Sequence, residues 1–157
     1  MILTMDQAAA FVRDAQARGQ RVVFTNGVFD LLHPGHVRYL QTARAEGDLL
    51  IVAVNSDRSV RANKGPARPV ISEQERAEII AALRVVDAAV IFDDETPQAI
   101  VDRLQPDVLV KGADWAADAI VGRETVEARG GRVVRVPIEQ GWSTSAIIKK
   151  AQAIPGR

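Results

Sequence analysis

Short apolar runs alternate with amphipathic helical patterns along most of this chain. Apolar or β-branched runs at residues 21–25, 49–55, 88–92, 108–110 and 132–136 predict five strands. Between them, apolar positions recur at helical spacing, as at Val37, Leu40 and Ala43. Strands with uninterrupted Val, Ile and Leu content are typical of a parallel sheet that is covered by helices on both faces.

Caps, prolines and glycines mark the expected helix boundaries. Helices are predicted over residues 4–18, 34–46, 72–83 and 97–105, ahead of Gly130, and from Ser143 onward. We therefore predict an α/β fold in a single domain over residues 1–157: a doubly wound, Rossmann-like, five-stranded parallel sheet of order 3-2-1-4-5. In this order, the loops 26–36 and 111–115 converge where the strand order reverses, and ligands bind at such points.

The segment from Thr25 to His36 joins the end of the first strand to the start of a helix. Asn26-Gly27 breaks the strand, and Pro34-Gly35 opens the helix. The free backbone N–H groups and the positive dipole end of a helix start favour an anion. His33 and His36, three residues apart, can point toward the same ligand. The segment therefore predicts a phosphate site, and two structural histidines are the alternative.

Three further segments carry groups that suit phosphate. Lys64 and Arg68 lie in a glycine- and proline-rich loop, which either folds over phosphates or is a solvated surface loop. Lys111-Gly112 follows a strand and faces the expected cleft, unless the lysine snorkels at the edge of the core. Ser143-Thr144-Ser145 opens the last helix, where hydroxyls serve a ligand or simply cap the helix.

Arg76 lies in the first turn of the helix predicted over residues 72–83, near the same edge of the sheet. It belongs either to the site or to an ion pair on the surface, which would contribute little to stability.

Composition limits the possible partners. The 20 basic and 20 acidic residues cancel, so no global field attracts nucleic acid or an acidic membrane surface, and we expect neither as a partner. The absence of cysteine excludes disulfides and thiolate metal sites, and the presence of only two histidines argues against a His-rich metal site. The amino terminus lacks a secretory pattern and no apolar run could span a bilayer, so we expect a cytoplasmic protein.

Several common catalytic motifs are absent from the chain. It contains no P-loop, no Gly-x-Gly-x-x-Gly after the first strand and no Gly-x-Ser-x-Gly elbow. What remains is a set of phosphate-binding groups without an obvious nucleophile. This combination favours phosphoryl or nucleotidyl transfer, in which positioning and charge stabilisation supply most of the catalysis.

Two segments resemble the signatures of the cytidylyltransferase-like nucleotidyltransferases. Gly27-Val28-Phe29-Asp30 with His33-Pro34-Gly35-His36 is similar to the first signature, and Trp142-Ser143-Thr144-Ser145 to the second. Within this superfamily, segments 52–57, 64–70, 110–115 and 143–150 most resemble the adenylyltransferases that act on a heptose 1-phosphate. The resemblance covers about residues 21–152.

This resemblance implies an activity. The expected reaction is in-line attack of D-glycero-β-D-manno-heptose 1-phosphate on the α-phosphorus of ATP, giving ADP-heptose and pyrophosphate for the lipopolysaccharide core without a covalent intermediate. Many bacteria fuse this activity to a sugar kinase, and this chain looks like the stand-alone form. The resemblance also suggests a homodimer or a higher homo-oligomer, and we expect Mg²⁺ to bridge the triphosphate.

The resemblance also implies roles for individual residues. The expected catalytic residues are His33, His36 and Lys64. The expected nucleotide-binding residues are Asn26, Gly27, Val28, Phe29, Gly35, His36, Lys111, Gly112, Ser143, Thr144 and Ser145. The expected residues on the sugar-phosphate side are Asp30, Asn55, Asp57, Lys64, Arg68, Asp114 and Trp115, and no residue is expected to bind a metal directly.

Other activities remain open on the sequence alone. Glycerol-3-phosphate cytidylyltransferases carry Arg-Thr-Glu-Gly-Ile-Ser-Thr-Thr at the second signature. This chain lacks that arginine and has Trp142 in place of isoleucine, which weakens a CTP assignment. The alternatives are a cytidylyltransferase for glycerol 3-phosphate or a related small phosphate, an FMN adenylyltransferase, or a nucleotide-binding regulatory domain without turnover.

Overall fold

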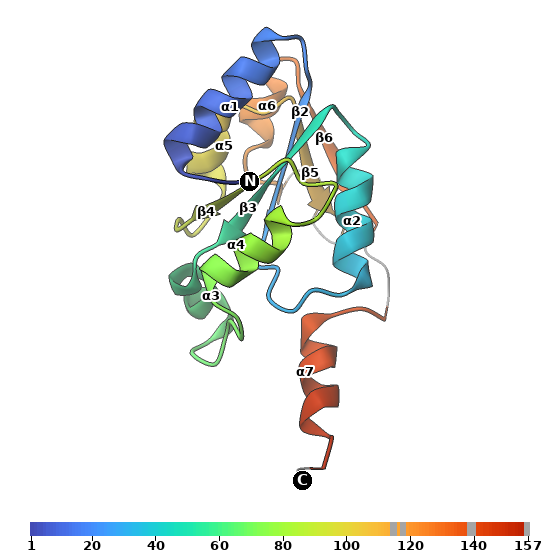
Figure 1. Ribbon diagram of the computed structural model, residues 1–157. Coiled ribbons are helices and arrows are strands. Elements are labelled where there is room, and N and C mark those ends of the chain that lie inside the picture. The colour runs from blue at the N-terminus through green and yellow to red at the C-terminus, as the bar shows by residue number, and fades with distance from the viewer. Residues whose placement is uncertain (114–115, 117–118, 138–140, 156–157) are drawn as a thin grey trace.

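A computed structural model of the chain describes residues 1–113, 116, 119–137 and 141–155. Within these residues, six parallel strands form one sheet in the order β1-β4-β3-β2-β5-β6 (Figure 1). The strands are β1 (Ile2–Leu3), β2 (Val22–Gly27), β3 (Leu49–Asn55), β4 (Ala88–Phe92), β5 (Val108–Gly112) and β6 (Arg132–Val136). The helices are α1 (Met5–Ala17), α2 (Pro34–Arg44), α3 (Asp57–Lys64), α4 (Glu73–Ala81), α5 (Gln98–Leu104), α6 (Arg123–Glu127) and α7 (Thr144–Gln152).

The predicted order of the five main strands is confirmed, but the predicted number of strands is wrong. The order 3-2-1-4-5 corresponds to β4-β3-β2-β5-β6. The additional strand, β1, pairs in parallel with the edge of β4, where Ile2 and Leu3 lie opposite Ala89 and Val90. Two residues are too few to show a strand period, so no pattern in the sequence indicates β1.

Helices cover both faces of the sheet, as predicted. On one face, α1, α5 and α6 bury residues such as Val12, Val101 and Val126 against the strands (Figure 1). On the other face, α2 and α4 bury residues such as Leu40 and Ile80. Among the described residues, no helix combines the length and the apolar character needed to cross a bilayer.

The amino-terminal ends of the central strands are closed by carboxylates. Asp107 Oδ2 accepts a hydrogen bond from the backbone N–H of Val22 at 2.8 Å, and Asp87 Oδ2 accepts one from that of Leu50 at 2.7 Å. These bonds satisfy strand donors at one end of the sheet. The carboxyl ends of the same strands lead into the loops where the ligand site was expected.

The last helix differs from the others in its packing. None of the residues of α7 is buried, and α7 extends away from the sheet (Figure 1). The amino-terminal end of α7 lies beside the loop that precedes α2, and there Thr144 Oγ1 donates a hydrogen bond to the carbonyl of Leu31 at 3.3 Å.

Candidate active site

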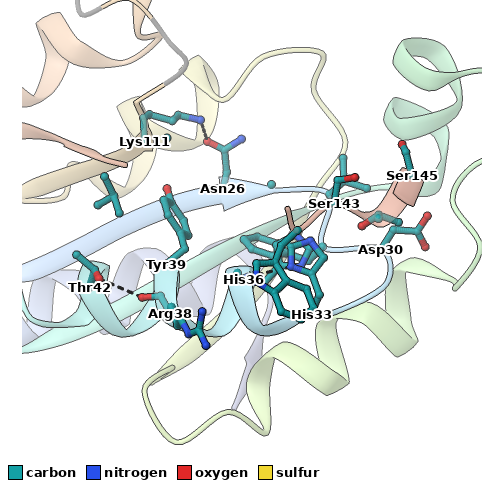
Figure 2. A pocket seen from close by; sticks show the side chains of 18 of the residues that line it. Asn26, Asp30, His33, His36, Arg38, Tyr39, Thr42, Lys111, Ser143 and Ser145 are labelled. Carbon is teal, nitrogen blue, oxygen red and sulfur yellow. Dashed lines mark hydrogen bonds between the residues drawn. The ribbon is translucent and has the colours of Figure 1, made fainter. Parts of the chain in front are cut away.

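A pocket of about 470 Å³ opens at the carboxyl ends of β2 and β5 (Figure 2). Its lining includes these predicted site residues: Asn26, Gly27, Val28, Phe29, Asp30, His33, Gly35, His36, Lys64, Arg68, Lys111, Gly112, Ser143, Thr144 and Ser145. The loops expected to converge therefore do so, and the start of α7 joins them. Asn26, Gly27, Lys111 and Gly112 belong to strand ends rather than loops, because β2 and β5 run two residues further than expected.

The turn after β2 is shaped by Phe29. Its φ of 49° lies in the left-handed region, which a non-glycine residue adopts only when its surroundings hold it there. The turn directs the buried Phe29 ring back under Gly27, where a Cβ atom would lie 3.0 Å from the ring. Only glycine fits this close approach without displacing the ring. The edge of the same ring meets His36, with centroids 5.5 Å apart at 60°.

The two histidines lie together at the start of α2. His33 is the N-cap, and its Nδ1 accepts a long hydrogen bond of 3.4 Å from the backbone N–H of His36. The two rings stack with centroids 3.8 Å apart and an interplanar angle of 21° (Figure 2). The structure thus places both residues where the sequence predicted, as one stacked aromatic pair at the start of α2.

The surroundings of the histidines favour their neutral forms. Burial lowers the pKa of His33 below its usual value. Burial, followed by repulsion from His33, lowers the pKa of His36 to about 4. Both imidazoles are therefore neutral near pH 7 in the free protein. Among the described residues, Nδ1 of His36 is the one buried side-chain polar atom without a hydrogen-bond partner, a costly feature that is common at functional sites.

Asp30 anchors the loop that follows α3. Its carboxylate is almost fully buried and accepts hydrogen bonds from Arg68 Nε at 2.7 Å and from the backbone N–H groups of Val70 and Ile71 at 2.9 and 3.1 Å. Burial alone raises the pKa of Asp30, but these three donors outweigh burial and hold the pKa below its usual value. Although Asp30 lines the pocket, its carboxylate is already used by the protein's own donors.

Arg76 lies beneath the turn after β2 and the loop before α4 and donates hydrogen bonds to both. Its side chain is fully buried, so the interpretation as a surface ion pair is wrong. The guanidinium donates to the carbonyls of Val28 at 2.6 Å and Ile71 at 3.0 Å, and to Asp57 Oδ1 at 2.7 Å. It therefore fastens the turn after β2 to the loop before α4 and to the start of α3. Arginine suits this role because its planar fork holds several acceptors at once.

Not every predicted residue on the sugar-phosphate side reaches the pocket. Asn55 and Asp57 lie outside its lining: Asn55 Nδ2 donates to Ser59 Oγ at 3.2 Å, and Asp57 pairs with Arg76. Asp114 and Trp115 fall outside the described residues.

Cations reach the pocket from three elements. Lys111, at the end of β5, donates to Asn26 Oδ1 on the neighbouring strand β2 (Figure 2). Lys64 is exposed at the carboxyl-terminal end of α3, a helix that was not predicted from the sequence. Arg68 follows in the loop and keeps its ion pair with Asp30. Together with the start of α2, these groups make the pocket favourable for a polyanion.

The second signature brings hydroxyl groups to the pocket on segment 141–145, which lies against segment 27–36. We call segment 27–36 the first wall of the pocket and segment 141–145 the second wall. Ser143 is the N-cap of α7 and accepts a hydrogen bond from the backbone N–H of Ala146 at 3.0 Å. Trp142 stacks on His33, with centroids 6.2 Å apart at 20°. Ser143 and Ser145 lie on the same side of the site as Asp30 (Figure 2). The starts of two helices, α2 and α7, therefore line one pocket.

Part of the pocket lining was not predicted from the sequence. Arg38, Tyr39 and Thr42 on α2 also face the pocket. Tyr39 Oη lies 2.8 Å from Thr25 Oγ1 and donates to the carbonyl of Val110 at 3.2 Å, which links α2 to β2 and β5. Its position three residues after His36 places it one turn further along the same helix face, a spacing that could have revealed it.

The chain is similar in sequence to known nucleotidyltransferase-like proteins. Residues 24–150 match the family described as Cytidylyltransferase-like. The bifunctional protein HldE of Geotalea uraniireducens is 56% identical over 149 residues, which cover 95% of this chain and 30% of that protein. The bifunctional protein HldE of Gluconobacter oxydans is 49% identical over 154 residues, covering 98% and 32%. The chain thus spans about a third of the length of these curated relatives.

Solved structures show the same fold. The lipopolysaccharide core biosynthesis protein from Thermoplasma volcanium has a TM-score of 0.63 and 33% identity, and the match covers 77% of this chain and 98% of that one. The pantoate-beta-alanine ligase from Francisella tularensis also has a TM-score of 0.63, over 97% of this chain and 77% of that one. Its identity is 15%, so the likeness concerns the fold alone.

Proposed function

This chain belongs to the cytidylyltransferase-like family, and on that premise we propose that it transfers AMP from ATP to D-glycero-β-D-manno-heptose 1-phosphate. A phosphate oxygen of the sugar attacks the α-phosphorus, the bond from that phosphorus to the β-phosphate oxygen breaks, and pyrophosphate leaves. The products are ADP-heptose, a precursor for the lipopolysaccharide core, and pyrophosphate. No covalent enzyme intermediate is needed, because the sugar phosphate itself supplies the attacking oxygen.

The observation that carries this proposal is the meeting of both signatures on one pocket. His33 and His36 from the first signature lie beside Ser143 and Thr144 from the second, although more than 100 residues separate them in the chain. A triphosphate requires several donors arranged around its oxygens, and two helix starts with flanking cations supply them.

The choice of acceptor has separate support. Segments 64–70 and 110–115 resemble those of adenylyltransferases that act on heptose 1-phosphate. One structural neighbour, of which this chain covers 98%, is described as a lipopolysaccharide core biosynthesis protein. The curated relatives are bifunctional proteins, and a chain that matches about a third of their length fits one of two activities.

We assign the transfer step to groups that stabilise charge without taking part covalently. Neutral His33 and His36 would donate hydrogen bonds to the α-phosphoryl oxygens, where negative charge grows. The start of α7, with Ser143 and Thr144, would hold the β- and γ-phosphates. Lys64 would approach the phosphates of both reactants from the end of α3. When the triphosphate binds, its negative charge raises the pKa of both histidines, because an adjacent anion favours the imidazolium form. The imidazolium form also donates hydrogen bonds to the α-phosphoryl oxygens.

We propose that Mg²⁺ enters as part of the ATP substrate. Within the described ranges, no group of three or more His, Asp or Glu side chains could hold a metal ion. Asp30, a described carboxylate in the pocket lining, is already bound by Arg68 and backbone donors. The ion would therefore be held mainly by phosphate oxygens and water, which Mg²⁺ accepts as ligands.

Pyrophosphate release with defined substrate pairs tests the function. The purified chain is incubated with ATP or CTP and with heptose 1-phosphate, glycerol 3-phosphate or FMN, and pyrophosphate is measured. We expect release with ATP and the β-anomer of heptose 1-phosphate. Preference for CTP with glycerol 3-phosphate, or for FMN, would replace this assignment with another nucleotidyltransferase. Binding of ATP without release for any acceptor would point instead to a regulatory domain.

We further propose a cytoplasmic enzyme with a single nucleotidyltransferase domain that assembles as a homodimer or a higher homo-oligomer. Family resemblance supports the assembly, and the use of ATP supports the location. Size-exclusion chromatography with light scattering measures the mass in solution, and a monomer at micromolar concentration would contradict the proposed assembly.

A further inference from the structure

The amino-terminal end of α7 rests on the loop and first turn of α2 through a small set of contacts. Thr144 Oγ1 donates to the carbonyl of Leu31 at 3.3 Å. Trp142 approaches Gly35 so closely that a Cβ on that glycine would lie 3.1 Å from the Trp142 Cβ. The helix itself buries none of its residues, so the body of α7 contributes little to this attachment.

A row of four aromatic rings, Trp142, His33, His36 and Phe29, runs from this attachment into the site. Trp142 stacks on His33 at 20°, and His33 stacks on His36 at 21°. His36 in turn meets the edge of Phe29, which lies beneath Gly27. His33 is therefore held between two rings, one from each signature. Neighbouring aromatic rings gain attraction beyond simple burial, and this attraction depends on their relative orientation.

Trp142 is poorly placed to stabilise the core. It is 42% exposed, and it precedes a helix without buried residues. Its contacts instead lie on Gly35 and His33, which both line the pocket. A side chain with these contacts affects where its neighbours lie more than whether the domain folds.

We propose that Trp142 is a positioning residue: it docks the start of α7 on the first turn of α2 and holds the His33 ring between two aromatic neighbours. In this way it sets the distance between the hydroxyl groups of the second signature and the histidines of the first. This proposal rests on the proposed function in one respect: it takes a triphosphate as the ligand that contacts both segment 27–36 and segment 141–145.

Removing the indole should separate the two walls. In Trp142→Ala, Ser143 and Thr144 lose their fixed position relative to His33, so the Kd and the KM for ATP should rise at least about 10-fold, since small misplacements weaken contacts steeply. Trp142→Phe keeps an aromatic face and should stay within about 3-fold of wild type. The melting temperature should change little in either variant. Ile154→Ala, an exposed apolar residue beyond α7, is the matched control and should leave all three quantities unchanged.

Inorganic tripolyphosphate separates positioning from direct contact with the base. It carries the phosphates of ATP without a nucleoside, so a positioning role predicts the same loss of affinity for tripolyphosphate and ATP in Trp142→Ala. Weaker binding of ATP alone would mean that the indole contacts the base, and the proposal would be overturned. A lowered melting temperature with unchanged Kd would also overturn it, because that pattern marks a purely structural residue.

These binding measurements do not depend on the acceptor. If no acceptor yields pyrophosphate but Trp142→Ala still weakens tripolyphosphate binding, the proposed function fails and the positioning role stands. If wild type turns over heptose 1-phosphate and Trp142→Ala matches it in KM and Kd, the function stands and the positioning role fails.

Discussion

The two walls of the pocket are built in different ways. The first wall, residues 27–36, is fastened from beneath by the buried side chains of Phe29, Asp30 and Arg76. The second wall, residues 141–145, rests on the surface of the first through Trp142 and Thr144 and leads into a helix without buried residues. Changes beneath the first wall should therefore alter both folding and catalysis, whereas changes in the second should alter ligand binding alone.

The largest expected effect comes from removing the support of the first wall. Arg76→Met leaves the carbonyls of Val28 and Ile71 and the carboxylate of Asp57 without their donor. Breaking a buried ion pair from one side costs about 3–5 kcal/mol, so the free energy of unfolding measured in urea should fall by that order or the chain should fail to fold.

Arg58→Met is the matched control for Arg76→Met. Arg58 also forms a close ion pair with an aspartate, Asp93, but both side chains are exposed. Exposed pairs contribute little, so this variant should unfold at nearly the wild-type urea concentration. Equal losses in the two variants would show that the first wall is not specially anchored.

The next effect concerns catalysis within the first wall. His36→Ala should lower kcat by roughly 100–1000-fold, the usual cost of losing a preorganised donor to the reacting phosphate. Circular dichroism should show a retained fold. Gln41→Ala, on an exposed position of the same helix, controls for disturbance of α2. Pyrophosphate release near the wild-type rate in His36→Ala would remove His36 from the mechanism.

Acid should destabilise the first wall in two separate pH ranges. His36 has a pKa of about 4 in the fold and about 6.5 when unfolded, so the unfolded chain binds more protons between these values. Stability should therefore fall as pH drops from 6.5 to 4, by roughly 1–3 kcal/mol. The lowered pKa of His33 acts in the same direction. The Asp30 contribution is present above the unfolded pKa of the carboxyl and disappears only as pH falls below about 4.

Urea unfolding at pH 7, 5.5 and 4.5 measures this dependence. The variant His36→Asn removes the titrating group while keeping a polar side chain of similar size. Its loss of stability between pH 7 and 4.5 should be smaller than that of wild type. An unchanged slope would assign the acid sensitivity to other groups.

Local patterns account for what the sequence could predict. The main strands followed from apolar runs, and their order followed from the doubly wound fold that alternating strands and helices indicate. The pocket-lining residues near Gly27 and Ser143 followed from short motifs at helix starts. Helix α3 was not predicted, because its sequence is almost entirely polar. The helix depends on the Ser56 cap and on the buried Val60. The cap is local, but the burial of Val60 becomes visible only when tertiary contacts form.

The charged residues were harder to predict for the same reason. Asp30 and Asp57 were expected to contact the sugar phosphate, yet their carboxylates bind arginines 38 and 19 residues away. No short motif reports such pairings, because they depend on how the loops between β3 and α4 fold back on the turn after β2. The same loops bury Arg76, whose position in the sequence resembles that of an ordinary surface arginine.

The smallest expected effect compares the same chemical change in both regions. Ser72 and Ser143 are each the N-cap of a helix, and each side chain accepts a backbone N–H three residues ahead. Helix α4 after Ser72 buries Arg76, Ala77 and Ile80, so loss of the cap in Ser72→Ala should lower the free energy of unfolding by about 1 kcal/mol.

Ser143→Ala removes an equivalent bond from α7, but this helix can fray without exposing any buried residue. The urea midpoint should therefore stay at the wild-type value, while the helical circular dichroism signal falls slightly and the KM for ATP rises. Equal losses of unfolding free energy in Ser72→Ala and Ser143→Ala would mean that α7 folds cooperatively with the domain. In that case the second wall would be as firmly anchored as the first.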